Sequence, residues 1–113
     1  LTLTIGRNCL VVYPTIEWEK FEDKMVEDDA ENEDESTAIR QIYDYLDALS
    51  MDKQGRILIP EKFRAYAGLV DECVILGIYN RIEIWSKSAW DSKVKDVEID
   101  FSKLGKQFNH LRF

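Results

Sequence analysis

A short run of charged residues around a glycine, Asp52-Lys53-Gln54-Gly55-Arg56, is the part of this sequence best suited to binding an anion. Gln54-Gly55 predicts a tight turn, because glycine reaches positive φ without a steric penalty. Asp52 and Arg56 are four positions apart and so flank one loop. The guanidinium of Arg56 has a fork that suits guanine or phosphate, and Lys53 at the tip supplies a point charge suited to phosphate.

Two roles are open for the charged pair of this loop. Asp52 suits a structural role, in which its carboxylate accepts hydrogen bonds from the amides of the turn and pairs with Arg56. Arg56 then either completes that pairing or contacts DNA. Arg64, a few residues further on, is another candidate for phosphate or base contact. We therefore predict Lys53, Arg56 and Arg64 as DNA-binding residues, and Asp52 and Gly55 as the residues that shape the turn.

The segments next to the charged turn predict a strand on each side and then a short helix. Ala48 to Met51 is the predicted strand that enters the turn, and Arg56 to Ile59 is the one that leaves it. Pro60 ends the second strand and can occupy the first position of a helix. Gly68 is typical of the residue that follows a helix, so the helix is expected to end there.

The sequence also contains a partial internal repeat, in which residues 9–18 match residues 81–90 at an offset of 72 positions. Each copy predicts a strand that ends in an aromatic residue, followed by the start of a helix that contains tryptophan. Residues 1–5 alternate and predict a strand before the first copy, and residues 73–78 predict a buried strand before the second. Such repeats are one supersecondary unit used twice.

Charge is distributed unevenly along the 113 residues, whose formal net charge is −7. Residues 17–36 contain eleven acidic and two basic side chains, so the rest of the chain is mildly basic. A helix is predicted from Thr15, the charge run 27–35 predicts a solvated loop, and Ser36 or Thr37 can cap a second helix. An acidic helix and loop can face away from a DNA-binding surface, so the negative total limits nonspecific affinity without forbidding a local basic patch.

Composition and motifs argue against several other classes of protein. The length fits one domain, and no apolar stretch approaches the roughly 20 residues that span a bilayer. Cys9 and Cys73 lie in apolar, strand-like segments and are expected to be buried, reduced thiols. His110 is the single histidine and has no ligand partners nearby, so neither a zinc site nor acid–base or nucleophilic catalysis is predicted. We expect no enzyme activity and no cofactor, metal or small-molecule substrate.

Together these residues resemble the MraZ family of bacterial transcriptional regulators. The resemblance is strong over residues 52–90, through D-K-Q-G-R-I-L-I-P, the helix at 61–68 and R-I-E-I-W followed by Ala89-Trp90. It is weaker over residues 9–46, through C-L-V-V-Y-P and E-W, and it does not extend to the tail after Val97.

The resemblance implies an α+β fold of two AbrB/SpoVT-like swapped-hairpin units with short helices, related by a pseudo-two-fold repeat. On this interpretation residues 1–46 form a partial first repeat with an acidic helix-loop-helix, residues 47–95 form a complete second repeat carrying D-x-x-x-R, and residues 96–113 form a C-terminal tail. The 72-residue offset pairs Leu1 with Cys73, so the sequence is expected to begin midway through the first unit.

The resemblance further implies a cytoplasmic, nucleoid-associated regulator that forms a ring-like homo-oligomer. It would bind double-stranded DNA at short direct repeats, upstream of the operon for cell division and wall synthesis that includes its own gene. Many weak, identical hairpins would then bind a repeated site by avidity. No membrane contact is implied.

Two alternative functions remain open at this point. The chain could be an oligomer-assembly module without DNA binding of its own, in which strand 1–5 seeks a partner strand. It could instead be an AbrB-like antitoxin that binds a toxin through the tail 96–113.

Overall fold

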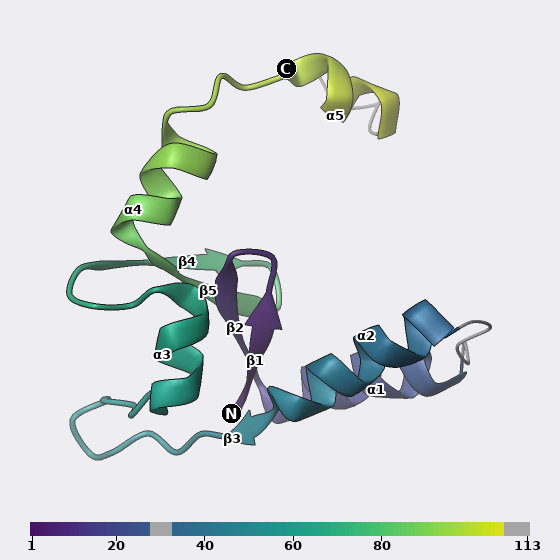
Figure 1. Cartoon of the computed structure of the whole chain (residues 1–113), viewed down its shortest axis with the longest axis vertical. Helices are drawn as coiled ribbons and strands as arrows, with labels where there is room; N and C mark the ends of the chain where they lie inside the picture. The colour runs from purple at the N-terminus through teal and green to yellow at the C-terminus, as the bar shows by residue number, and fades with distance from the viewer. Residues whose placement is uncertain (28–32, 108–113) are drawn as a thin grey trace.

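Alternating apolar residues in the two hairpins build four strands of one antiparallel sheet, and the two-residue strand β3 adds a fifth, in the order β3-β1-β2-β5-β4 (Figure 1). The computed structural model describes residues 1–27 and 33–107. The strands are β1 Thr2–Gly6, β2 Cys9–Tyr13, β3 Asp47–Ala48, β4 Cys73–Ile78 and β5 Arg81–Ser86. The helices are α1 Thr15–Glu27, α2 Glu33–Asp44, α3 Glu61–Ala67, α4 Lys87–Trp90 and α5 Phe101–Gln107, with a π-helical turn at Asp91–Lys95. The α+β prediction is therefore confirmed.

The two hairpins share one register, which shows the internal repeat in three dimensions. Leu3 pairs with Val12 in the first hairpin, and Ile75 pairs with Ile84, 72 residues later, in the second. Strands β2 and β5 pair at the centre of the sheet, where Val11 lies opposite Glu83. These two residues are also 72 positions apart, so a local two-fold axis passes between them. The repeat seen in the sequence is therefore a pseudo-two-fold in the fold.

One face of the sheet carries the main core, which α3 and the segment before it cover. Phe63 and Ala67 lie on the buried side of α3, one turn apart, and pack with Leu49 against the strands. Leu3 and Leu10 from the first hairpin have no exposed surface at all. Gly68 ends α3 in the left-handed conformation with φ of 66°, as predicted for a glycine at this place. The helix that follows the charged loop is thus fixed to the sheet.

The opposite face carries a smaller cluster made of Cys9, Val11 and Trp85, against which Trp90 of α4 packs. The rings of Trp85 and Trp90 meet edge to face at 5.8 Å. The Ser86 hydroxyl accepts a hydrogen bond from the amide of Ala89 and caps α4. Burial raises the pKa of the Cys9 thiol to about 11.

The prediction that Cys73 is buried was wrong. Its side chain is exposed, because β4 is an edge strand of the sheet and Cys73 is its first residue. An apolar run in the sequence identifies a strand but does not say whether another element covers it. Only Cys9 is the buried thiol that was expected.

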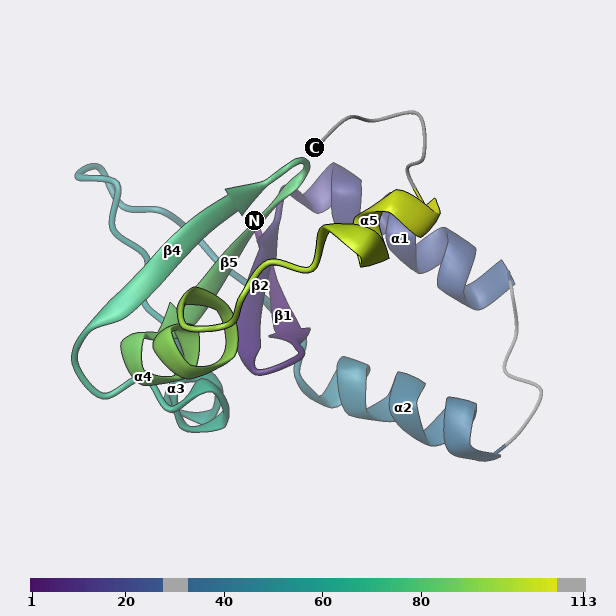
Figure 2. The ribbon, with the colours of Figure 1, turned by 90° about the horizontal axis from the view of Figure 1, so that it is seen from above.

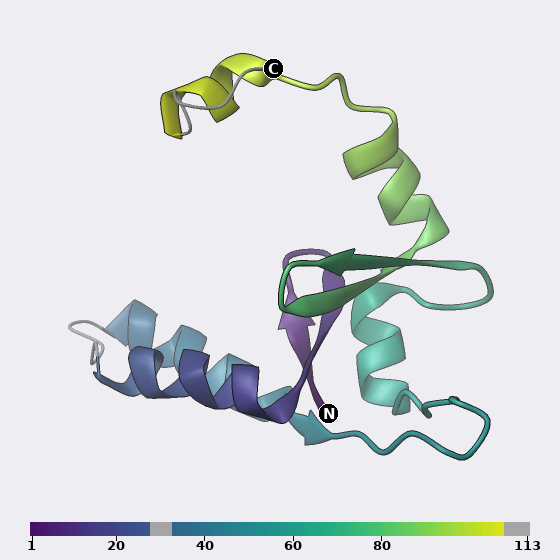
Figure 3. The same cartoon turned by 180° about the vertical axis from the view of Figure 1, so that it is seen from behind.

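The acidic segment forms a two-helix arm that projects to one side of the sheet, and the charged loop projects to the other (Figures 1 and 3). The Tyr43 hydroxyl on α2 donates a 2.8 Å hydrogen bond to Glu22 on α1. Helix α2 begins at Glu33, so residues 33–35 are helical where a loop was predicted. Acidic side chains favour the first turn of a helix, which explains the earlier start. Glu27, the first residue of the predicted loop, is the last residue of α1, and residues 28–32 lie outside the described residues.

Beyond the sheet the chain continues through α4 and an extended segment to α5, which lies well away from the strands (Figure 1). His110, predicted to have no ligand partners, lies outside the described residues. Among the residues that the structure describes, no helix is both long enough and apolar enough to cross a membrane. No group of three or more potential metal ligands occurs in residues 1–27 or 33–107 either.

The turn of the first hairpin requires a residue without a side chain at position 6. A Cβ added to Gly6 would lie 2.8 Å from Val11 Cγ2 and 3.0 Å from Cys9 Sγ. Gly6→Ala is therefore expected to destabilise the fold by about 1–3 kcal/mol, the usual cost of an overpacked site. Gly77→Ala is the matched control, because a Cβ at Gly77 meets nothing within 4 Å. Urea unfolding of the two variants measures the difference, and equal effects would contradict this account.

Candidate nucleic-acid interface

The charged loop runs from Leu49 to Ile59, so the strand predicted at 48–51 is present only at Ala48, and the strand predicted at 56–59 was wrong. Strand β3 stops at Ala48, and residues 56–59 form no strand. The backbone of the loop closes on itself through the 2.9 Å bond from the amide of Asp52 to the carbonyl of Arg56. Beyond that bond the two sides of the loop do not pair with each other. Leu49 on the first side, and Ile57 and Ile59 on the second, pack against the core instead. Packing on the sheet thus replaces pairing between the two sides.

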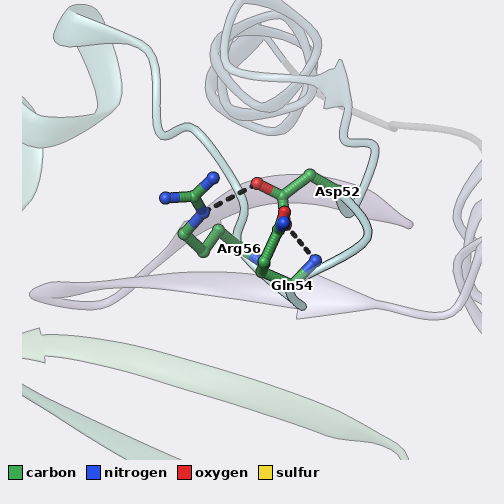
Figure 4. Close-up of polar contacts among 3 residues, drawn as sticks. All are labelled: Asp52, Gln54 and Arg56. Atoms are coloured by element: carbon green, nitrogen blue, oxygen red, sulfur yellow. Dashed lines mark hydrogen bonds and ion pairs between the residues drawn. The ribbon is translucent and has the colours of Figure 1, made fainter.

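Asp52 organises the tip of the loop, as Figure 4 shows. Its Oδ1 accepts hydrogen bonds from the amides of Gln54 and Arg56 at 2.9 and 2.8 Å. Its Oδ2 accepts a 2.8 Å bond from Nε of Arg56. Gly55 turns the chain with φ of 79° and donates its amide to the carbonyl of Asp52 at 3.0 Å. One carboxylate therefore fixes both the backbone of the turn and a guanidinium.

Arg56 is held by only one of its three guanidinium nitrogens. Nε bonds to Asp52, while neither terminal nitrogen makes a hydrogen bond to the residues drawn in Figure 4. The side chain stays 75% exposed. A fork of N–H donors that is oriented but not consumed suits a phosphate or the acceptor edge of guanine. The two roles left open for Arg56 by its sequence, pairing and DNA contact, are compatible in this geometry.

The hydrogen bonds at Asp52 lower the pKa of its carboxyl group. The largest cause is the backbone amide of Arg56, followed by the Arg56 side chain and the amide of Gln54. Because the folded pKa is depressed, the ordering of the loop by Asp52 is complete above the ordinary value of 3.8 and is lost as pH falls through the folded pKa.

An NMR titration of the Asp52 carboxyl carbon is expected to give an inflection below the ordinary value of 3.8. Arg56→Ala should move the inflection only part of the way back, since the amide of residue 56 still donates to Oδ1. An inflection at or above 3.8 in the unsubstituted chain would show that the loop does not adopt this geometry in solution.

The other two predicted cations lie on neighbouring elements. Lys53 is exposed at the tip of the same loop, and Arg64 is exposed on α3, which follows the loop directly. Neither side chain makes a hydrogen bond or ion pair with another residue in the part of the chain that the structure describes. No bond joins Arg64 to the loop, so the structure brings Lys53 and Arg56 together and leaves Arg64 as a separate positive charge.

Helix α3 anchors the loop through two side chains that sequence reasoning did not single out. Lys62 donates to the carbonyl of Asp44, forms a 3.0 Å ion pair with its carboxylate, and lies 4.4 Å from the centre of the Tyr45 ring. Tyr66 donates a 2.8 Å hydrogen bond to the carbonyl of Gly6. Lys62 is therefore engaged with the end of α2, although its charge alone would make it a candidate for phosphate contact. The sequence holds no signal for these nonlocal partners.

The chain is similar over most of its length to one family of proteins. The family model described as "MraZ protein, putative antitoxin-like" matches residues 47–108, which include the charged loop and α3. The match continues past Val97, so the expectation that the resemblance ends there was wrong. A protein of Clostridium beijerinckii named "Transcriptional regulator MraZ" is 37% identical over 103 residues, covering 91% of this chain and 72% of that protein. Proteins of the same name from Desulforamulus reducens and Pediococcus pentosaceus are 38% and 36% identical, covering 92% and 85% of this chain and 73% and 67% of their own lengths.

Proposed function

Because this chain belongs to the MraZ family, we propose that it is a DNA-binding transcriptional regulator that contacts the duplex through the tip of its charged loop, residues 52–56. The observation that carries the proposal is the geometry of Arg56, whose guanidinium is fixed through Nε by Asp52 while the side chain stays 75% exposed. Because Asp52 already orders the Arg56 side chain in the free protein, DNA binding costs less side-chain entropy. The proposal involves no catalysis.

Roles for the three cations follow from where they lie. Arg56 would read guanine or grip a phosphate through its terminal nitrogens, and Lys53 would contact a phosphate from the tip. Arg64 on α3 would add a phosphate contact at the side of the loop. The acidic arm of α1 and α2 projects away from the loop, which leaves the loop side free of most of the negative charge (Figure 3).

Three cations assigned to DNA contact in each chain imply weak binding by a single copy, so we propose that several copies act together. A ring-like homo-oligomer would present its loops to short direct repeats, and avidity would raise the overall affinity. The target would be the promoter of the division and cell-wall gene cluster that contains the regulator's own gene, and the protein would work at the nucleoid in the cytoplasm.

The test is a fluorescence-anisotropy titration with the promoter fragment that precedes this chain's own gene, combined with light scattering for the mass of the complex. Binding should weaken steeply with salt, since each phosphate contact releases counterions. A fragment with one repeat should bind far more weakly than one with several. A multimer that ignores both duplexes would indicate an assembly module, and a second, small protein that co-purifies would indicate an antitoxin; either result would refute the proposal.

A further inference from the structure

The two halves of the chain differ in the helices that follow their hairpins, although the hairpins share one register. In the first half α1 and α2 form the two-helix arm, in which the Tyr43 hydroxyl donates a hydrogen bond to Glu22. In the second half α4 and the π-helical turn take the place of α1, since Trp90 is 72 positions after Trp18. Helix α5 follows after residues 96–100 and lies well away from both α4 and the sheet (Figures 1, 2 and 3).

Helix α5 combines an apolar side with positive charge. Phe101 and Leu104 are one turn apart and share one side of the helix, and Phe101 is 52% exposed. Lys103 is exposed on the same helix, and residues 101–113 contain three basic residues and no acidic one. A helix of seven residues is too short to be stable in water by itself, so its apolar side needs a surface to pack on. Such a surface should be both apolar and acidic.

A surface with both properties lies at the base of the acidic arm. It is a groove of about 330 Å³ between α1 and the residues that join α2 to β3. Trp18 and Leu46 line it with apolar side chains, and Glu19, Glu22 and Asp47 line it with carboxylates. None of these three acids forms an ion pair in the described part of the chain. The negative charge of the groove is therefore not neutralised by a neighbouring cation there.

Charge and reach decide where α5 can pack. Residues 87–95 contain three lysines and one aspartate, so like charge opposes a return of α5 to its own α4. The elements that border the groove, β3 and the start of α1, lie at the opposite end of the molecule from α5, along a longest dimension of 41 Å (Figure 1). Residues 96–100 span at most about 18 Å when fully extended, which is less than half of that dimension. The tail is therefore placed to reach the groove of a second copy.

We propose that α5 of one copy docks in the groove beside Trp18 of a second copy. In this contact Phe101 and Leu104 pack on Trp18 and Leu46, and Lys103 lies next to the carboxylates of the groove. Each copy has one tail and one groove, so the contact is head-to-tail and can close into a ring. It forms without DNA and does not involve the charged loop. The inference rests on the proposed function only for the closed ring, and it can fail while DNA binding stands.

The assembly is measured by light scattering of the whole chain without DNA, over a range of concentrations. Leu104→Asp should raise the concentration at half-assembly at least about tenfold, because burial of one leucine contributes more than a factor of ten to affinity. Val70→Asp is the matched control, since it introduces the same charge at a site that is 93% exposed and outside both surfaces. It should leave the assembly unchanged. Equal shifts in the two variants, or an unsubstituted chain that stays monomeric, would overturn the proposal.

Charge reversal tests whether the groove belongs to a second copy. Lys103→Glu and Glu19→Lys should each weaken assembly alone, because like charges then meet in every contact. A mixture of the two variants should assemble better than either alone, since every contact between unlike copies joins opposite charges. A mixture that assembles no better than its components would overturn the proposal, because the tail would then bind its own groove or another protein.

A DNA titration separates this contact from the proposed function. Leu104→Asp should not change binding to a duplex with one repeat, because the charged loop is intact in each copy. If the unsubstituted chain assembles but binds no DNA, the result counts against the charged loop and leaves the tail contact standing. If Leu104→Asp abolishes binding to the one-repeat duplex, the tail itself contacts DNA and the proposal is overturned.

Discussion

Arg56→Ala is expected to weaken DNA binding at least about tenfold, because one bidentate contact is worth about 1–3 kcal/mol and every copy in a multimer loses it. The dependence of log affinity on log salt should also become shallower by about one unit per copy bound if the contact is to phosphate. Anisotropy titrations with the promoter fragment at two salt concentrations measure both quantities. The fold should survive, since the Arg56 side chain is mostly exposed.

Two variants separate the role of Arg56 from its charge. Arg40→Ala removes one positive charge from an exposed site on α2, in the acidic arm, and should leave affinity nearly unchanged. Arg56→Lys keeps the charge but loses the planar fork and the Nε bond to Asp52, so it should recover only part of the affinity. If Arg40→Ala and Arg56→Ala weaken binding equally, only the total charge matters and the loop is not the site.

Phe63→Ala should have the largest effect on stability, because it removes the ring that fixes α3 to the sheet. The side chain is buried in the main core and meets the Tyr45 ring edge to face at 5.6 Å. Truncation of a buried phenylalanine costs about 3–5 kcal/mol, a large share of the 5–15 kcal/mol typical of a whole domain. Urea unfolding followed by tryptophan fluorescence measures the loss, since Trp18 and Trp85 are buried.

Leu58→Ala is the matched control, since it truncates an apolar side chain of the same segment that is 83% exposed. Its free energy of unfolding should change by no more than about 0.5 kcal/mol. If Phe63→Ala were equally mild, α3 would not be an anchor, and the position assigned to the loop would lose its support.

Local signals in the sequence were enough to predict much of the fold. Period-two alternation identified both hairpins, and Gly68 marked the end of a helix. The 72-residue repeat predicted the pseudo-two-fold, because identical local patterns adopt identical hairpins. Features that depend on residues close together in the sequence could therefore be predicted.

The errors concern features that distant partners decide. Residues 56–59 have the composition of a strand, yet Ile57 and Ile59 pack on the core and no strand forms. Cys73 has an apolar context, yet its edge is uncovered. Lys62 resembles the other cations, yet Asp44 and Tyr45 engage it. The local sequence pattern does not show whether another element covers a strand edge, or which residue pairs with an exposed charge.

For the site, the sequence indicated that Asp52 shapes the turn and left Arg56 between two roles. Only the geometry shows that Asp52 binds Nε alone, so that pairing does not exhaust the donors of Arg56. A four-residue spacing permits this arrangement without requiring it, because the rotamers of both side chains are free in an unfolded loop.

The measurement that tests the central claim most directly is hydrogen exchange of the whole chain with and without the promoter duplex, resolved by segment. DNA is expected to slow exchange most at the tip of the charged loop, residues 52–56, and next at the exposed side of α3, while exchange in the arm of α1 and α2 stays unchanged. Protection confined to the arm, to the β4–β5 turn or to the segment around α5, with the loop unaffected, would contradict it.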